Sequence, residues 1–292
     1  MLPQVNEWSK DMWPLAGWLD EYLSGDGQIE LAVTDLKRGG MVKIGHGLLA
    51  ADAGHWSAAK RDMAFGFSRM LYSEMIDILA SKGKGRFISS DLDISTRYML
   101  GALSVGQPQL VKPFYKIVCD ALDADYGLRD GRVPARDTTL RFAAFGLAII
   151  GDWLGIPLDL DKHGLPRDPA WGQLVSNWRE TTTDLLLRSL VAACDTHVER
   201  IAVTGREVDT QAAEFEFASV FEAVHPTEIL AILRLRDLLN LPNPPIIDHP
   251  LMQTPYAAIT CGPDEVTERD ELLDRFLAVV RQRDPHVLPS GL

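Results

Sequence analysis

Residues 225–241 read HPTEILAILRLRDLLNL, and this stretch decides the fold predicted for the chain. At 100° per residue its aliphatic side chains spread around most of the helix circumference, as in a helix enclosed by other helices. Pro226 suits the first helical turn, and Glu228 is favourably placed near the positive end of the helix dipole. Pro242 and the prolines that follow it end the helix. The sequence therefore predicts a central helix over residues 227–241.

Amphipathic helices are predicted on both sides of this central helix. The clearest covers residues 181–203, where apolar side chains gather on one face and charged side chains on the other. Further helices are expected over residues 11–23, 41–52, 56–79, 94–105, 110–122, 137–154, 209–224 and 264–283. The alternation EFEFA at 214–218 is too short to displace the helical period. The predicted fold is an all-α, repeat-like bundle of antiparallel helical hairpins without significant sheet.

Two halves of different charge are expected to pack closely as one body. The polar, turn-rich segment 159–169 separates the amino-terminal half, 1–158, from the carboxyl-terminal half, 159–292. Residues 1–150 carry 18 acidic and 17 basic side chains, whereas residues 151–292 carry 23 acidic and 12 basic ones, so that the net charge of −12 is concentrated in the later half. An acidic half repels nucleic acid and anionic membranes and attracts a basic protein. An ordinary role in solubility stays open.

The positions of the cysteines and the length of the apolar stretches bear on disulfide content and on the cellular compartment. The cysteines Cys119, Cys194 and Cys261 are far apart and form no CxxC pair, so neither a zinc site nor a disulfide framework is predicted. The amino terminus has no secretion signal, and the longest uncharged apolar stretch, 142–151, is too short to span a bilayer. A cytoplasmic protein is expected.

Catalytic patterns are weak throughout the sequence. GHGLLA at 45–50 resembles a dinucleotide-binding motif but lacks the strand that should precede it. Glu222 and His225 form one Glu-x-x-His, not the two copies of a di-iron bundle. His197 follows Cys194 by three residues on one helix face, and a hydrogen-bonded core histidine is favoured over a metal ligand. No catalytic residue, cofactor or metal ligand is therefore predicted, and the chain is not expected to be an enzyme.

A run of carboxylates offers candidate partner-binding residues. It begins at residue 207 and is followed by the rigid proline-rich segment that ends near residue 248. The alternative is a merely solvated face, which charge runs often form. The candidate partner-binding residues are Glu207, Asp209, Glu214, Glu216, Glu222 and Asp248.

The chain resembles the α-helical immunity proteins of bacterial polymorphic and contact-delivered toxin systems, including type VI secretion. The resemblance covers roughly residues 40–260. It rests on the order and general character of the segments and not on a strict motif. The residues that carry it are the turns Asp52-Ala53-Gly54 and Gly106-Gln107-Pro108, the helix segment Asp195-Thr196-His197-Val198, and the stretches 224–236 and 248–252.

The resemblance implies a non-enzymatic protein that binds one cognate toxin, often a basic nuclease, and occludes or disrupts its active site. Carboxylates of the acidic half would steer such a partner, and aromatic or aliphatic anchors would slow its release. Two alternatives remain, a helical-repeat adaptor without a toxin and a helical enzyme with an unrecognised site.

Overall fold

The computed structural model describes residues 5–6, 15–84, 90–134, 138–202, 215–260, 262 and 265–289. The predicted all-α class is confirmed, because the regular elements of these residues are helices, and Ile201 and Phe217 form an isolated β-bridge rather than a strand. No described helix combines the length and apolar character needed to cross a bilayer. The helices are α2 (Trp18–Leu23), α3 (Ile29–Asp52), α4 (Trp56–Ala80), α5 (Leu92–Ser104), α6 (Pro108–Ala124), α7 (Arg141–Leu154), α8 (Pro169–Asn177), α9 (Thr183–Glu199), α11 (Val220–Val224), α12 (Thr227–Leu238) and α13 (Glu271–Arg283), with 3₁₀ turns η2 (Pro250–Gln253), η3 (Pro255–Ala258) and η4 (Pro285–Val287).

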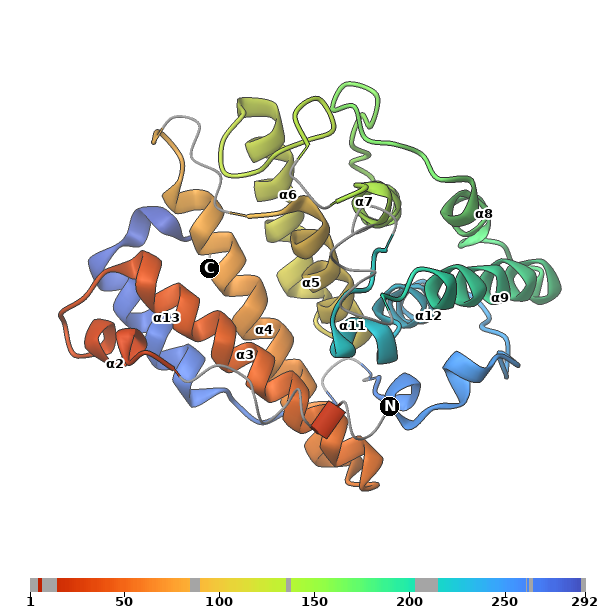
Figure 1. Cartoon of the computed structure of the whole chain (residues 1–292), viewed down its shortest axis with the longest axis horizontal. Helices are drawn as coiled ribbons and strands as arrows, with labels where there is room; N and C mark the ends of the chain where they lie inside the picture. The colour runs from red at the N-terminus through yellow and green to blue at the C-terminus, as the bar shows by residue number, and fades with distance from the viewer. Residues whose placement is uncertain are drawn as a thin grey trace.

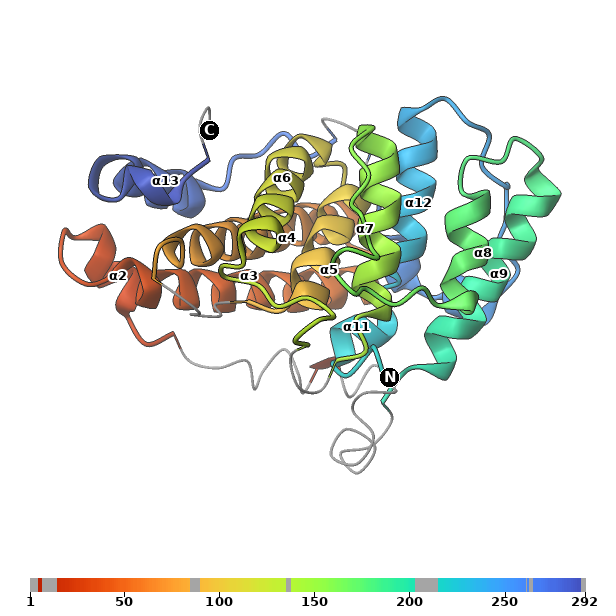
Figure 2. The same ribbon diagram turned by 90° about the horizontal axis from the view of Figure 1, so that it is seen from above.

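The long hairpin of α3 and α4 forms one side of the bundle (Figures 1 and 2). Glycines allow these two helices to approach closely. A Cβ atom added to Gly40 would lie 2.9 Å from the carbonyl oxygen of Gly66, and one added to Gly66 would lie 2.9 Å from the carbonyl oxygen of Gly40. Real Cβ atoms do not approach backbone so closely, so the crossing of α3 and α4 depends on both glycines.

Helix α12 is enclosed, as the sequence predicts. It packs on α5 and also contacts α9, so that it lies between the central helices and the α8–α9 end of the molecule (Figure 2). Ile229, Ile232 and Leu235 are fully buried. The helix ends at Leu238, three residues before the predicted end.

Several predicted boundaries are wrong. Helix α3 begins at Ile29, whereas the sequence placed its start at residue 41. Gly39 and Gly40 are weak helix formers, and the close packing of Gly40 on α4 outweighs that weakness. Helix α8 was not predicted at all. Residues 215–219, expected to be helical, lie outside α11, and Phe217 forms the bridge to Ile201.

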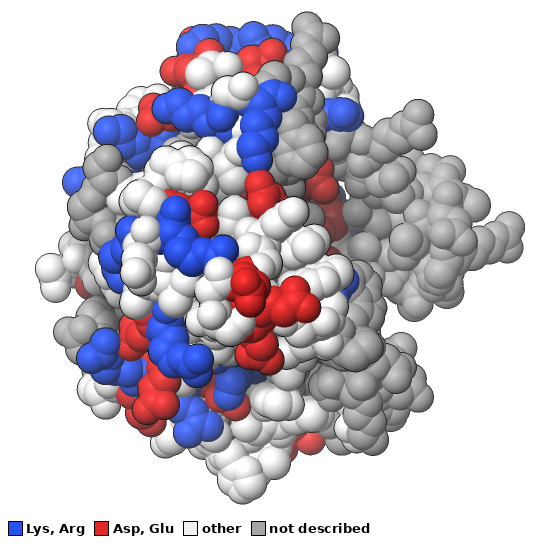
Figure 3. Space-filling view, turned by 90° about the vertical axis from the view of Figure 1, so that its left-hand side faces the viewer, with Lys and Arg blue, Asp and Glu red and all other residues white. Residues whose placement is uncertain are grey.

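At the α2 and α13 end of the molecule, side chains of both charges are interspersed over the surface (Figure 3). Ion pairs account for part of this pattern. Arg69 of α4 donates two hydrogen bonds of 2.7 Å to the carboxylate of Asp270, which also caps the amino terminus of α13. The carboxylate therefore joins α13 to α4 and serves the structure of this end.

Substitution of Gly66 by valine is expected to reduce the free energy of unfolding by about 2 kcal/mol or more, the range typical of overpacking a core. The new side chain would meet both Ile44 and the backbone of Gly40. Urea denaturation of the wild type and the variant measures this loss.

Gly39→Ala is the matched control in the same hairpin. A Cβ atom there meets only the Nη1 atom of Arg69 at 3.5 Å, an ordinary contact. This variant should be as stable as the wild type or more stable by up to about 1 kcal/mol, through helix propensity. Equal losses in Gly39→Ala and Gly66→Val would contradict the proposed close approach.

Candidate functional site

The fold separates the predicted partner-binding carboxylates. Glu207, Asp209 and Glu214 lie outside the described residues. Glu216 and Glu222 face into the protein, whereas Asp248 is exposed. Of the three described candidates, only Asp248 is therefore exposed.

Glu216 belongs to an internal ionic network. Its side chain is only 4% exposed and lies 3.0 Å from Nη1 of Arg200. The same carboxylate accepts hydrogen bonds from Nε1 of Trp171 at 3.0 Å and from the hydroxyl of Thr139 at 3.2 Å. Burial raises the pKa of Glu216, and the charge of Arg200 opposes that rise. Glu216 is therefore not an exposed, partner-facing carboxylate. Its oxygens already bind Trp171 of α8 and Arg200 at the end of α9.

Glu222 also has internal partners. It forms a capping box with Ser219 at the start of α11, and its Oε1 atom lies 3.1 Å from Nε of Arg97. Arg97 in turn donates to the carbonyl oxygen of Glu216 at 2.8 Å. Because Glu222 caps a helix and balances a buried cation, its first role is structural.

Arg97 is the central residue that the sequence analysis missed. Its guanidinium lies over the rings of Phe142, at 4.4 Å, and Phe217, at 5.2 Å from the ring centres. It borders a cavity of about 220 Å³ that Asp91 and Asp93 also line. The local signal for Arg97 is a charged residue in the middle of α5, among mainly apolar and small side chains. The cavity is acidic on balance, but its carboxylates are largely engaged within the fold.

Two of the segments that carry the family resemblance meet in the core. His197 of α9 and Glu228 of α12 are fully buried, with Nδ1 2.7 Å from Oε1. The other ring nitrogen, Nε2, lies 3.2 Å from the carbonyl oxygen of Ala223, to which it donates. The ring also stacks on Phe217 at 3.9 Å. The expectation of a hydrogen-bonded core histidine is confirmed.

His225 is a second buried histidine beside this pair. Its Nδ1 atom lies 2.9 Å from the carbonyl oxygen of Tyr256 and donates to it. Burial lowers the pKa of His225 to about 4. The imidazole is therefore neutral in the folded protein at neutral pH, and its bond to Tyr256 joins α12 to η3.

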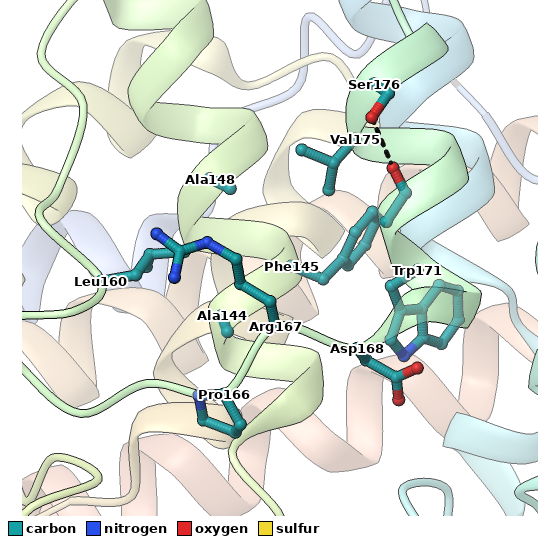
Figure 4. A pocket seen from close by; sticks show the side chains of 11 residues that line it. Ala144, Phe145, Ala148, Leu160, Pro166, Arg167, Asp168, Trp171, Val175 and Ser176 are labelled. Carbon is teal, nitrogen blue, oxygen red and sulfur yellow. Dashed lines mark hydrogen bonds between the residues drawn. The ribbon is translucent and has the colours of Figure 1, made fainter.

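A small apolar pocket lies between α7 and α8 (Figure 4). Its volume is about 180 Å³, and its wall includes the stacked rings of Phe145 and Trp171, whose centres are 4.9 Å apart. Ala144 and Ala148 of α7 leave the space open, and Arg167 crosses its mouth (Figure 4). The pocket suits a small apolar group.

Another cavity, of about 390 Å³, combines Cys119 with a buried histidine. His163 lies between Asp123, 3.1 Å from Nε2, and Asp130, 3.3 Å from Nδ1. Burial raises the pKa of the Cys119 thiol to about 11. At neutral pH the thiol stays protonated and is a poor nucleophile, so these residues do not form an activated cysteine site.

The outer face of α9 and the adjoining proline-rich segment form what we call the α9 surface. The two parts are joined where Nε2 of His249 approaches Oδ1 of Asp195 at 3.3 Å. Two aliphatic side chains are exposed here, Val198 at 49% and Ile246 at 66%. The exposed residues that define the surface are Asp184, Arg188, Asp195, Val198, Glu199, Ile246 and Asp248.

Carboxylates dominate the α9 surface. Glu199 and Asp248 make no ion pair with any described residue. Arg188 is the one basic member of the surface. Unlike Glu216, Glu199 and Asp248 are exposed, and among the described residues they have no ionic partner.

Comparison with known proteins assigns no family, since no family model, curated protein or solved structure matches the chain. Within the described part of the chain, no group of three or more His, Cys, Asp or Glu side chains is arranged to hold a metal ion.

Charge reversal should separate internal from outward-facing carboxylates. Glu216→Lys would bury a cation beside Arg200 and leave the Trp171 N–H without its acceptor, so we expect a loss of about 3–5 kcal/mol in the free energy of unfolding. Asp248→Lys should change that free energy by no more than about 0.5 kcal/mol. Urea denaturation of both variants tests the contrast, and comparable losses would contradict the assignment.

His225 should make the protein less stable in acid. Its pKa is about 4 when folded and about 6.5 when unfolded, so the unfolded chain binds the extra proton between these values. The contribution is complete above pH 6.5 and is lost as the pH falls towards 4. At about pH 4.5 the loss should reach about 2–3 kcal/mol.

His225→Asn keeps a donor near Tyr256 and removes the titrating group. Its free energy of unfolding, measured in urea, should fall less between pH 7 and about pH 4.5 than that of the wild type, by the same 2–3 kcal/mol or so. Equal falls in both proteins would show that His225 does not titrate as its burial indicates.

Proposed function

We propose that this chain is an immunity protein, which binds one cognate toxin and neutralises it without chemistry of its own. The toxin is expected to be a basic protein of the nuclease type. The observation that carries the proposal is the α9 surface, where the exposed carboxylates Glu199 and Asp248 accompany the exposed aliphatic residues Val198 and Ile246.

Each kind of side chain on this surface has a separate role in binding. Exposed carboxylates attract a basic partner over a distance comparable with the Debye length and speed its association. Apolar side chains that become buried in a complex slow its dissociation. Val198 and Ile246 are large enough and exposed enough to serve as such anchors.

Inhibition follows from competition for the same positive charge. A nuclease binds the phosphate backbone through lysine and arginine side chains. A partner that covers those side chains with carboxylates excludes the nucleic acid. The position of α9 at one end of the molecule, opposite α2 and α13, leaves room for a large partner (Figures 1 and 2).

The same surface also suits a helical adaptor that binds a basic protein with no toxic activity. An adaptor binds its partner without changing the survival of the cell, whereas an immunity protein restores growth. A growth assay therefore separates the two functions.

The test uses the product of the gene adjacent to the one that encodes this chain. We expect the two proteins to co-purify, and co-expression of this chain to restore the growth of cells that produce the adjacent protein. The double variant Glu199→Lys, Asp248→Lys should weaken binding at least about tenfold, since reversed charges repel a basic surface. Binding is measured by titration calorimetry at low and high salt.

The matched control is the double variant Asp120→Lys, Glu268→Lys. Both residues are exposed and lie outside the α9 surface, and the change in net charge is the same. This control should bind and protect like the wild type. Equal weakening in both double variants would point to net charge alone, and binding without restored growth would favour the adaptor.

A further inference from the structure

The apolar pocket between α7 and α8, which we call the α7–α8 pocket, is a candidate ligand site outside the α9 surface. Its volume of about 180 Å³ is close to that of apolar cavities that take up one benzene ring. Small residues on both helices leave this space open, namely Ala144 and Ala148 of α7 and Gly172 of α8. A Cβ atom added to Gly172 would meet no heavy atom within 4 Å beyond its own stretch of helix. The space therefore continues beside this glycine.

The aromatic wall of the α7–α8 pocket is held in place from behind. Phe145 and Trp171 are buried, and their ring centres stack 4.9 Å apart. Leu160 and Arg167 lie on the opposite side of the pocket (Figure 4). The indole N–H of Trp171 donates to Oε2 of Glu216 at 3.0 Å, which fixes the orientation of the ring. The wall is thus formed before a ligand arrives, and binding does not have to order it.

The polar side chains at the α7–α8 pocket already have partners inside the protein. Arg167 donates to the carboxylate of Asp161 at 3.1 Å, and the hydroxyl of Ser176 donates to the backbone of its own helix at 2.9 Å. Asp168 caps the amino terminus of α8 and forms an ion pair with Arg200 at 2.6 Å. A charged ligand would have to displace one of these partners, so the lining favours a neutral ligand.

An aromatic ring suits this wall better than an aliphatic group of the same size. Rings prefer offset-stacked or edge-to-face contacts with other rings, and these contacts stabilise a pair beyond the apolar area that they bury. The stacked rings of Phe145 and Trp171 offer such contacts to a third ring. Leu160 and Val175 supply aliphatic contacts around it.

We propose that the α7–α8 pocket binds a small neutral molecule with one six-membered aromatic ring. The ring would lie against Phe145 and Trp171, and a polar substituent would point past Arg167 into solvent. This inference does not depend on the proposed function, because the site requires neither a toxin nor the carboxylates of the α9 surface.

The test titrates the full-length protein with four probes that share one carbon skeleton, namely benzyl alcohol, cyclohexylmethanol, benzoate and benzylammonium. Shifts of the methyl signals of Ala148, Leu160 and Val175 in the isotope-labelled protein locate binding and give each Kd. We expect benzyl alcohol to shift these signals and to bind at least about threefold more tightly than the other three probes. No saturable shift at these methyl groups would overturn the proposal. Equal binding of cyclohexylmethanol or of a charged probe would also overturn it.

A variant that fills the pocket sharpens the test. Gly172→Leu would place a side chain in the space beside the glycine. Leucine favours a helix more than glycine does, so the variant should melt at a temperature no lower than the wild type. Its Kd for benzyl alcohol should rise at least about tenfold, since the ring could no longer be buried.

The matched control for the filled pocket is Gln173→Leu, at the next and exposed position of α8. This variant should bind benzyl alcohol like the wild type. Unchanged binding in Gly172→Leu would place the probe elsewhere and overturn the proposal.

A peptide-bound ring distinguishes a free ligand from the side chain of a partner. N-acetylphenylalanine amide carries the same ring on a peptide backbone. Because Arg167 crosses the mouth of the pocket and is held by Asp161, we expect this probe to bind more weakly than benzyl alcohol (Figure 4). Binding at least as tight as that of benzyl alcohol would overturn the assignment to a free small molecule and point to an aromatic side chain of a partner.

Discussion

Buried charges in this protein must be balanced inside the fold, and this requirement fixes how helices far apart in the sequence meet. Arg97 of α5 faces Glu222 of α11 and the backbone of Glu216, both more than 100 residues later in the chain. Arg200 balances the Glu216 carboxylate in turn. Loss of one partner would leave an uncompensated buried charge, which costs more than the pair contributes. The network therefore sets the relative positions of α5, α8, α9 and α11.

A second buried pair extends the same constraint to the centre of the bundle. His197 joins α9 to Glu228 at the start of α12, and the His225 imidazole joins that start to η3. Helix α9 is thus fixed from within by its buried face, while its opposite face presents Glu199 and Val198 to solvent. A rigid helix with a free outer face is well suited to protein recognition, because binding does not have to order it.

The functional proposal depends on which carboxylates have partners inside the fold and which are exposed. The net acidity of the later half arises from both kinds of carboxylate, but only those without an internal partner can attract another molecule. Asp248 and Glu199 are therefore better candidates for partner binding than Glu216, which is bound inside the protein. In the proline-rich segment, Asn243 is held by buried Arg236, while Ile246 and Asp248 are exposed.

The sequence by itself determined the helical class, the enclosed helix α12 and the surface position of α9, because hydrophobic periodicity reports which faces of a helix are buried. It also identified His197 as a core residue. Only the tertiary structure decided that residues 29–40 are helical despite Gly39 and Gly40, that 215–219 are not, and that Glu216 points inward. The reason is that the sequence does not show which side chains a carboxylate contacts in the folded protein. Arg200, Trp171 and Thr139 come from three other segments, and their convergence on Glu216 exists only once the chain has folded.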